Sequence, residues 1–267
     1  MLLAALILAA TATPERCFTV DHRRVCAVGP RRSGLPLVFF LHGYGGRGTD
    51  DDFALESLAR RGDFLYAYAD GAGPRGEWTE ADVPFLTRAI ARLVAKLGAD
   101  RRRVSLVGFS AGGFMALEYA CAEPRRLAAA VSLGGTRFEP PRACRPGAVS
   151  ILQIHGEVDD VVLPAGGVGR RTGRTYLSAA ASAQIAATAA GCGALEPSRD
   201  PRLELRVQRA SGCKDGARVE MWMLPSVGHA APPTPSFPNQ IWDFLSRARS
   251  PARPAKKPPA APRRGSR

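Results

Sequence analysis

Short apolar runs typical of β-strands alternate with helical patterns along most of this chain. Strands separated by helices pack as a mostly parallel, twisted sheet with helices on both faces, so the pattern predicts an α/β fold. The first two strands have three residues between them and are expected to form an antiparallel hairpin at the sheet edge. Strands are expected near residues 17–20, 24–28, 36–41, 64–69, 103–108, 128–133, 149–154 and 219–224, and helices near 82–97, 111–122, 176–190 and 237–247.

The two ends of the chain differ in composition from its middle. Residues 1–12, MLLAALILAATA, are too short to span a bilayer and end in small residues suited to signal peptidase, so they are interpreted as an export signal without a basic start. Residues 250–267 are rich in Pro and Arg, which predicts a disordered tail. One α/β domain is expected over residues 13–249, and no other stretch approaches the length of a membrane span.

The net charge of +13 lies largely in the tail. Residues 246–267 hold eight basic side chains and no acidic one, so the remainder carries about +5. Arginines elsewhere are scattered along the sequence, and we therefore expect no nucleic-acid partner.

The six cysteines are even in number, and none belongs to a Cys-x-x-Cys pair of the kind that binds metals or transfers electrons. Fifteen pairings are formally possible, and buried free thiols are an alternative. Local pairs would each close a loop between neighbouring predicted elements, which favours an oxidising, secreted or periplasmic location. These pairs are Cys17 with Cys26, Cys121 with Cys144, and Cys192 with Cys213.

A Gly-x-Ser-x-Gly sequence lies between a strand and a helix. The apolar run 104–107 is followed by Gly108-Phe109-Ser110-Ala111-Gly112 and then by a helical pattern. This is the setting of a nucleophile elbow, in which the serine occupies a strained turn that requires small residues on both sides. The following helix directs its first N–H groups at a developing oxyanion. Ser110 is the predicted nucleophile, and a merely tight Gly-rich turn is the alternative.

His229 is the predicted base among four histidines. His22 lies in the first hairpin turn, and His42 and His155 each end a strand in a His-Gly turn, where structural hydrogen bonding is common. His229 follows the last strand on a loop that can reach the carboxyl edge of the sheet. A surface histidine is the alternative interpretation.

The acid should follow the serine and precede the histidine, on a loop after a strand. The segment after strand 149–154 offers three carboxylates, of which Asp159 is preferred, Asp160 is held in reserve and Glu157 is interpreted as a solvated turn residue. The order Ser110, Asp159, His229 is that of the α/β-hydrolases.

An oxyanion hole needs a second N–H donor, expected on the loop after an earlier strand. Strand 37–41 leads into the Gly-rich turn His42-Gly43-Tyr44-Gly45-Gly46. The Tyr44 N–H is predicted to act beside the Ala111 N–H, with Gly45 as the alternative donor. A phosphate-binding loop is excluded because no Gly-Lys-Ser/Thr ending follows.

Residues 34–246 resemble the secreted polyhydroxybutyrate depolymerase and feruloyl esterase family of α/β-hydrolases. The resemblance rests on LHGYGG, DVPFLTRAI, GFSAGG, HGEVDDVV, AAGCGALEP and GCKDGARVEMWMLPSVGHA. It implies a triad at Ser110, Asp159 and His229, and it supports the bridge between Cys192 and Cys213. The sequence after His229 departs from the family's Trp-Pro-Gly, and the segment 71–83 is short, so Trp78 and Tyr44 are the expected aromatic substrate contacts.

Together these features predict a secreted serine esterase, monomeric, needing no metal or organic cofactor. Its substrates would be feruloyl or acetyl esters of polysaccharide, or polyhydroxyalkanoate chains. The alternatives are a serine peptidase of α/β-hydrolase type and an inactive module that binds a wall or polymer through the basic tail. The loop between Cys192 and Cys213 precedes the strand leading to His229, so reduction is expected to weaken both stability and activity.

Overall fold

The computed structural model describes residues 14–200, 205–230 and 234–250. The predicted export signal at 1–12 lies outside the described residues, as does the predicted tail apart from its first residue, Ser250. Among the described helices, none combines the length and apolar character needed to cross a bilayer.

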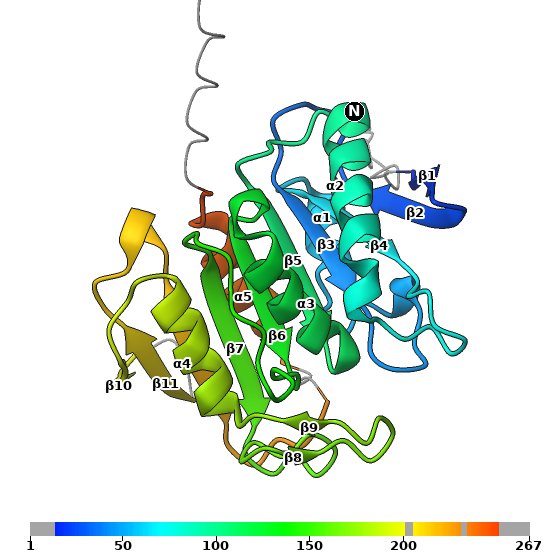
Figure 1. Ribbon diagram of the computed structural model, residues 1–267. Coiled ribbons are helices and arrows are strands. Elements are labelled where there is room, and N and C mark those ends of the chain that lie inside the picture. Colours follow the sequence, from blue (N-terminus) through cyan, green and yellow to red (C-terminus); the bar gives the residue numbers. More distant parts are fainter. Residues whose placement is uncertain (1–13, 201–204, 231–233, 251–267) are drawn as a thin grey trace, which may run out of the picture.

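A ten-stranded sheet in the order β1-β2-β4-β3-β5-β6-β7-β12-β11-β10 forms the centre of the molecule (Figure 1). The strands from β4 to β12 in this order run parallel, whereas β1 and β2 at one edge and β11 and β10 at the other run antiparallel to their neighbours. The strands are β1 Arg16–Val20, β2 Arg23–Val28, β3 Leu37–Leu41, β4 Leu65–Ala69, β5 Val104–Phe109, β6 Ala129–Leu133, β7 Ser150–Gly156, β10 Leu195–Ser198, β11 Arg206–Ala210 and β12 Val219–Leu224.

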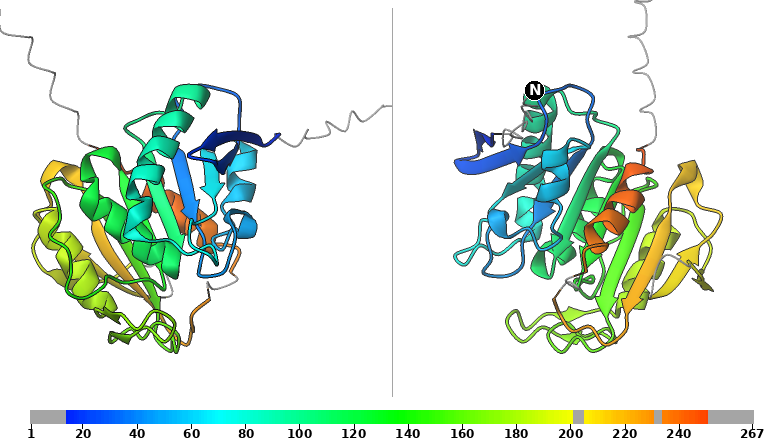
Figure 2. Two further views of the ribbon diagram at one scale, coloured as in Figure 1. Left: turned by 45° about the vertical axis from the view of Figure 1, so that its right-hand side comes forward. Right: turned by 180° about the vertical axis from the view of Figure 1, so that it is seen from behind.

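Helices cover both faces of this sheet (Figure 2). On one face lie α2 (Val83–Leu97), α3 (Ala111–Ala122) and α4 (Ala179–Ala189), and on the other lie α1 (Glu56–Arg61) and α5 (Phe237–Ser246). Short 3-10 turns span Gly48–Asp50, Glu80–Asp82, Pro124–Arg126 and Lys214–Gly216. The predicted α/β-hydrolase architecture, a mostly parallel sheet with an N-terminal antiparallel hairpin and helices on both faces, is therefore confirmed.

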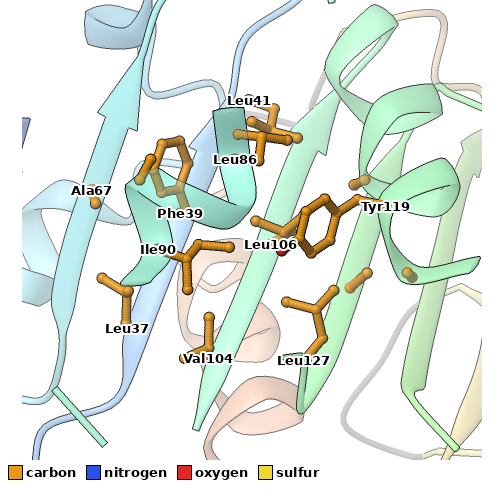
Figure 3. Close-up of a cluster of buried hydrophobic side chains, with 14 of the residues drawn as sticks. Leu37, Phe39, Leu41, Ala67, Leu86, Ile90, Val104, Leu106, Tyr119 and Leu127 are labelled. Carbon is orange, nitrogen blue, oxygen red and sulfur yellow. The ribbon is translucent and has the colours of Figure 1, made fainter. Parts of the chain in front are cut away.

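The parallel strands are buried on both faces, which explains their continuous apolar runs. On the side covered by α2 and α3, Phe39 of β3 and Leu106 of β5 pack against Leu86 and Ile90 of α2 and Tyr119 of α3 (Figure 3). α2 presents apolar residues at helical spacing to the sheet, whereas α3 is buried on nearly all sides, and this burial supplies the main driving force for folding. The outcome is a rigid platform whose strand ends carry the loops described below.

Several elements escaped the sequence analysis. The edge strand β10, its neighbour β11 and the helix α1 were not expected, and Tyr176 belongs to a small hairpin of β8 (Gly167–Val168) and β9 (Thr175–Tyr176), not to a helix. In β11, RVQRA, only Val207 is buried. A short antiparallel strand of this kind carries too little apolar alternation to be recognised from sequence.

All three expected disulfides are present in the structure, between Cys17 and Cys26, Cys121 and Cys144, and Cys192 and Cys213. The described residues include no free cysteine. The first bridge joins directly opposed residues of the β1–β2 hairpin. The second joins the end of α3 to the segment before β7, and the third joins the segment after α4 to the segment before β12. The last two therefore tie helices to the amino end of the sheet.

Candidate active site

Ser110 occupies a sharp turn between β5 and α3. Its backbone has φ 51° and ψ −116°, outside the regions that L-residues ordinarily adopt. A Cβ on Gly108 would lie 2.1 Å from the carbonyl oxygen of Gly112, and one on Gly112 would lie 1.9 Å from that of Leu41. Both positions therefore admit only glycine, as expected for the flanks of a nucleophile elbow.

His229 and Asp159 form a hydrogen-bonded chain with Ser110. The Ser110 Oγ and His229 Nε2 atoms lie 2.9 Å apart, and His229 Nδ1 lies 2.8 Å from Asp159 Oδ2. The Phe109 ring packs beside the imidazole, with 5.0 Å between ring centroids. The three residues come from the turn after β5, the loop after β7 and the loop after β12. Because these strands are parallel, all three residues lie at the carboxyl ends of the strands.

Asp159 is buried, with 2% of its surface exposed. Its Oδ1 accepts hydrogen bonds of 2.9 Å from the backbone N–H groups of Val161 and Val162. Burial alone would raise the pKa of this carboxyl group, but hydrogen bonds from His155, His229 and Val162 outweigh it and hold the pKa well below the ordinary aspartate value. Asp159 therefore remains an acceptor for the His229 Nδ1–H at neutral pH.

The two His-Gly turns differ in their contacts. His42 is fully buried, donates from Nδ1 to the carbonyl oxygen of Gly43 at 2.7 Å, and accepts at Nε2 from the Gly71 N–H at 3.0 Å. His155 is also fully buried and donates from Nε2 to the carbonyl oxygen of Val162 at 2.7 Å. The same Nε2 lies 3.3 Å from Asp159 Oδ2. His155 thus has a contact with the acid that its position in a His-Gly turn did not reveal.

The turn after β3 lies against the serine. A Cβ on Gly43 would come within 3.6 Å of the Ser110 Cβ, so the next residue, Tyr44, begins beside the nucleophile. Within the three ranges that the structure describes, the backbone N–H groups of Tyr44 and Ala111 form no hydrogen bond to the protein. Both N–H groups are available to a ligand bound at Ser110.

Trp78, the expected aromatic substrate contact, is largely buried. Only 7% of its surface is exposed, and it belongs to the core beside α2 and β3. Its ring centroid lies 5.4 Å from that of His42, and the Arg23 guanidinium packs 5.3 Å from the Trp78 ring centroid. Residues distant in sequence bury this side chain and leave little of it for contact with a substrate. Tyr44, by contrast, remains half-buried at the rim.

The other acids near the site are placed differently from Asp159. Asp160 is exposed, and Glu157 pairs with Arg206 at 3.1 Å. Burial, followed by the negative charges of Asp50 and Asp51, raises the pKa of Asp52 to about 6, while His229 opposes the rise. Asp52 is thus a carboxyl group close enough to His229 to interact with it electrostatically.

One group of potential metal ligands occurs in the described part of the chain: Glu15, Cys17 and Cys26. The two sulfurs are bonded to each other. Metal binding by cysteine requires a thiolate, so this group does not fit a metal ion.

The sequence and the fold are both similar to those of esterases. A model of the phospholipase/carboxylesterase family matches residues 76–179. A protein of Nocardia uniformis subsp. tsuyamanensis named as an esterase, NocK, is 30% identical over 141 residues, or 47% of this chain. That match spans 40% of NocK.

Among solved structures, the Aspergillus awamori acetyl xylan esterase has a TM-score of 0.66 at 15% identity, covering 87% of this chain and 99% of that chain. Esterase PE8 has a TM-score of 0.55 at 20% identity, covering 88% and 97%. The chain is therefore an α/β-hydrolase by fold, and the sequence matches support a serine hydrolase that acts on ester bonds.

Proposed function

We propose that the protein is a secreted serine esterase in which Ser110, His229 and Asp159 form the catalytic triad. The observation that carries the proposal is the continuous hydrogen-bonded chain from Ser110 Oγ through His229 to Asp159, at distances of 2.9 Å and 2.8 Å. A nucleophile, a base and an orienting carboxylate in mutual contact are the arrangement that acyl transfer requires.

In the first half of the reaction, the Ser110 Oγ attacks the ester carbonyl carbon while His229 Nε2 takes the hydroxyl proton. Asp159 accepts the Nδ1–H and stabilises the imidazolium. The imidazolium then gives its proton to the departing alkoxide, the alcohol leaves, and the acyl group remains on Ser110. In the second half, His229 deprotonates a water that attacks the acyl-enzyme, which releases the carboxylic acid and restores the serine.

The oxyanion that forms in each half is assigned to the N–H groups of Tyr44 and Ala111. Ala111 is the first residue of α3, so its N–H points out of the helix end that carries partial positive charge. Two preorganised donors of this kind stabilise the tetrahedral oxygen more than the ground-state carbonyl.

The proposed substrates are feruloyl or acetyl esters of polysaccharides or polyhydroxyalkanoate chains. The sequence motifs support this class, and so does the fold likeness to an acetyl xylan esterase. The loop around Asp159 and the β8 strand also leave four large apolar side chains 45% to 61% exposed, which offers contacts for an apolar substrate. They are Val158, Val161, Leu163 and Val168. The three disulfides fit a secreted or periplasmic location.

The test is turnover of p-nitrophenyl acetate by the wild-type protein and by Ser110→Ala, with Ser57→Ala as a control at an exposed serine on α1. Ser110→Ala should lose on the order of 10³-fold or more in rate while keeping a folded circular dichroism spectrum. Ser57→Ala should keep its rate. Near wild-type turnover by folded Ser110→Ala would show that another residue is the nucleophile. A panel of methyl ferulate, acetylated xylan and hydroxybutyrate oligomers would then identify the ester class.

A further inference from the structure

Three separate segments meet at the Tyr44 side chain. Tyr44 lies in the turn after β3, Arg75 in the loop after β4, and Arg171 in the turn of the β8–β9 hairpin. Arg75 Nη1 donates a 2.8 Å hydrogen bond to the Tyr44 hydroxyl oxygen, and the Arg171 guanidinium lies 4.9 Å from the centroid of the Tyr44 ring. Figure 1 shows the β8–β9 hairpin beyond the carboxyl ends of the parallel strands, where the candidate triad also lies.

The turn that carries Tyr44 lies beside the candidate nucleophile. Gly43, the residue before Tyr44, packs against the Ser110 side chain. The loop that carries Arg75 is held against the same turn, because a Cβ on Gly76 would lie 3.2 Å from the Gly46 carbonyl oxygen and 3.4 Å from the His42 ring. The two guanidinium groups contact Tyr44, whose backbone N–H is one of the proposed oxyanion donors, so they lie on that side of the site.

The positive charge of this rim is incompletely neutralised. Arg174, on the same hairpin, pairs with Glu80 at 2.8 Å. Glu77 accepts a hydrogen bond from the backbone N–H of Arg75, and its charge, after the hydrogen bond to Tyr44, helps to raise the pKa of the Arg75 guanidinium. In the part of the chain that the structure describes, Arg171 forms no ion pair, and the Arg75 guanidinium donates its hydrogen bond to the neutral Tyr44 hydroxyl and not to Glu77. A guanidinium whose N–H groups donate to no carboxylate can still bind an anion by charge-assisted hydrogen bonds.

We propose that Arg75 and Arg171 bind a carboxylate on the substrate, so that the enzyme prefers esters carrying an anionic group near the scissile bond. This inference rests on the proposed esterase function. The Tyr44 ring fixes the two cations, and both attract an anionic ester toward Ser110 before it binds. Because both arginines are exposed, each contributes a modest effect, about 3-fold in the preference for an anionic ester and about 10-fold for the pair.

The test compares kcat/KM for esters that differ chiefly in charge, after subtraction of the uncatalysed hydrolysis of each ester. On the acyl side, mono-4-nitrophenyl succinate is compared with 4-nitrophenyl butyrate, and on the alcohol side 4-acetoxybenzoate is compared with its methyl ester. The wild-type enzyme should favour the anionic member of at least one pair at low ionic strength, and added salt should reduce that preference.

The variants are Arg75→Gln, Arg171→Gln and the double variant, with Arg170→Gln as a matched control. Arg170 lies on the same turn but, among the described residues, has neither a hydrogen bond nor a cation–π contact with Tyr44. The ratio of anionic to neutral kcat/KM should fall about 3-fold in each single variant and about 10-fold in the double variant, and should hold in Arg170→Gln. A wild-type enzyme without such a preference, or an equal fall in Arg170→Gln, would overturn the proposal.

Binding to Ser110→Ala separates this proposal from the esterase function. In calorimetry, Ser110→Ala should bind 4-acetoxybenzoate more tightly than its methyl ester. The variant Ser110→Ala/Arg75→Gln/Arg171→Gln should bind the two ligands equally. Tighter anion binding to Ser110→Ala, together with no ester hydrolysis by the wild-type protein, would support the arginine site and reject the esterase function. Ester turnover with equal binding of the two ligands would do the reverse.

Discussion

The two ends of the sheet are stabilised by different means. At the amino ends of the parallel strands, two disulfides join the helices α3 and α4 to the segments that enter β7 and β12. At the carboxyl ends there is no such cross-link among the described residues. Instead, hydrogen bonds hold Ser110, Asp159 and His229, the serine has an unfavourable backbone conformation, and large apolar side chains are exposed.

This difference separates stability from chemistry. Strain and exposed apolar surface cost stability, and they are tolerated at functional sites when the rest of the fold compensates. Changes at the carboxyl end should therefore alter turnover more than unfolding, and changes at the amino end should do the opposite. Four predictions test this division, in order of decreasing effect.

The largest effect should come from Asp159→Asn, which should lower kcat by about 10⁴-fold because an amide no longer holds the His229 Nδ1–H in the correct tautomer. Asp160→Asn, at the exposed neighbouring position, should leave kcat within a few-fold of wild type. Both are measured with p-nitrophenyl acetate. Equal losses, or a larger loss in Asp160→Asn, would reassign the acid.

The disulfide at the amino end should matter for stability. The bridge between Cys192 and Cys213 closes a loop with a sequence separation of 21, so in the chain-entropy account it contributes about 3 kcal/mol. Because it lies at the opposite end of β12 from His229, we now expect Cys192→Ala/Cys213→Ala to lower the Tm while kcat at 25 °C changes little.

Cys17→Ala/Cys26→Ala, which opens a shorter loop in the edge hairpin, is the control and should lower the Tm less. A fall in kcat at 25 °C that matches the loss of Tm would show that the amino end also supports the chemistry. Non-reducing peptide mapping checks that the wild-type protein carries the bridges.

His155 should affect turnover through Asp159. A hydrogen bond to a charged group is worth about 1.5–3 kcal/mol, and since the Val162 carbonyl shares this donor we expect the low end, about a 10-fold loss of kcat in His155→Leu. Losing the donor raises the pKa of Asp159, but His229 and the backbone N–H groups still hold the carboxylate ionised, so the rate should fall through its orientation and not through its protonation. His155→Gln retains an N–H donor and should recover most of the rate. Equal losses in both variants would reduce His155 to a packing role.

The smallest effect concerns Asp52. Its folded pKa of about 6 lies above the ordinary value near 3.9, so ionisation costs stability as the pH rises through this interval. Asp52→Asn should therefore be more stable than wild type at pH 8, and this gain in the free energy of unfolding should exceed the gain at pH 4 by about 1 kcal/mol after allowance for solvent screening. Asp160→Asn is the control in urea unfolding at both pH values. A gain in Asp52→Asn that is the same at pH 4 and pH 8 would exclude a role for its ionisation.

Much of the fold was predictable because the parallel strands are locally distinctive. Continuous apolar runs identify buried strands, and the Ser110 turn combines a strand, two obligatory glycines and a helix within a few residues. The chain order of Ser110, Asp159 and His229 then follows from where parallel strands end. The strands β10 and β11 were missed because Val207 is their only buried side chain.

The contacts between distant loops could not be predicted. His42 and His155 occur in identical dipeptides, yet only His155 reaches the acid, because the chain after β7 folds back so that Val162 and Asp159 surround its ring. The burial of Trp78 depends on Arg23 and His42, and the cluster at Tyr44 depends on a hairpin more than 120 residues away in sequence. Each is a tertiary contact that no local pattern encodes.

The central claim is that His229 and Asp159 activate Ser110. Reaction with a fluorophosphonate probe, followed by peptide mass spectrometry, measures this directly because the probe phosphonylates an activated serine. The wild-type protein should carry a single adduct on the peptide containing Ser110, and His229→Ala should react on the order of 10³-fold more slowly. An adduct on another serine, or labelling of Ser110 at an undiminished rate in folded His229→Ala, would contradict the account.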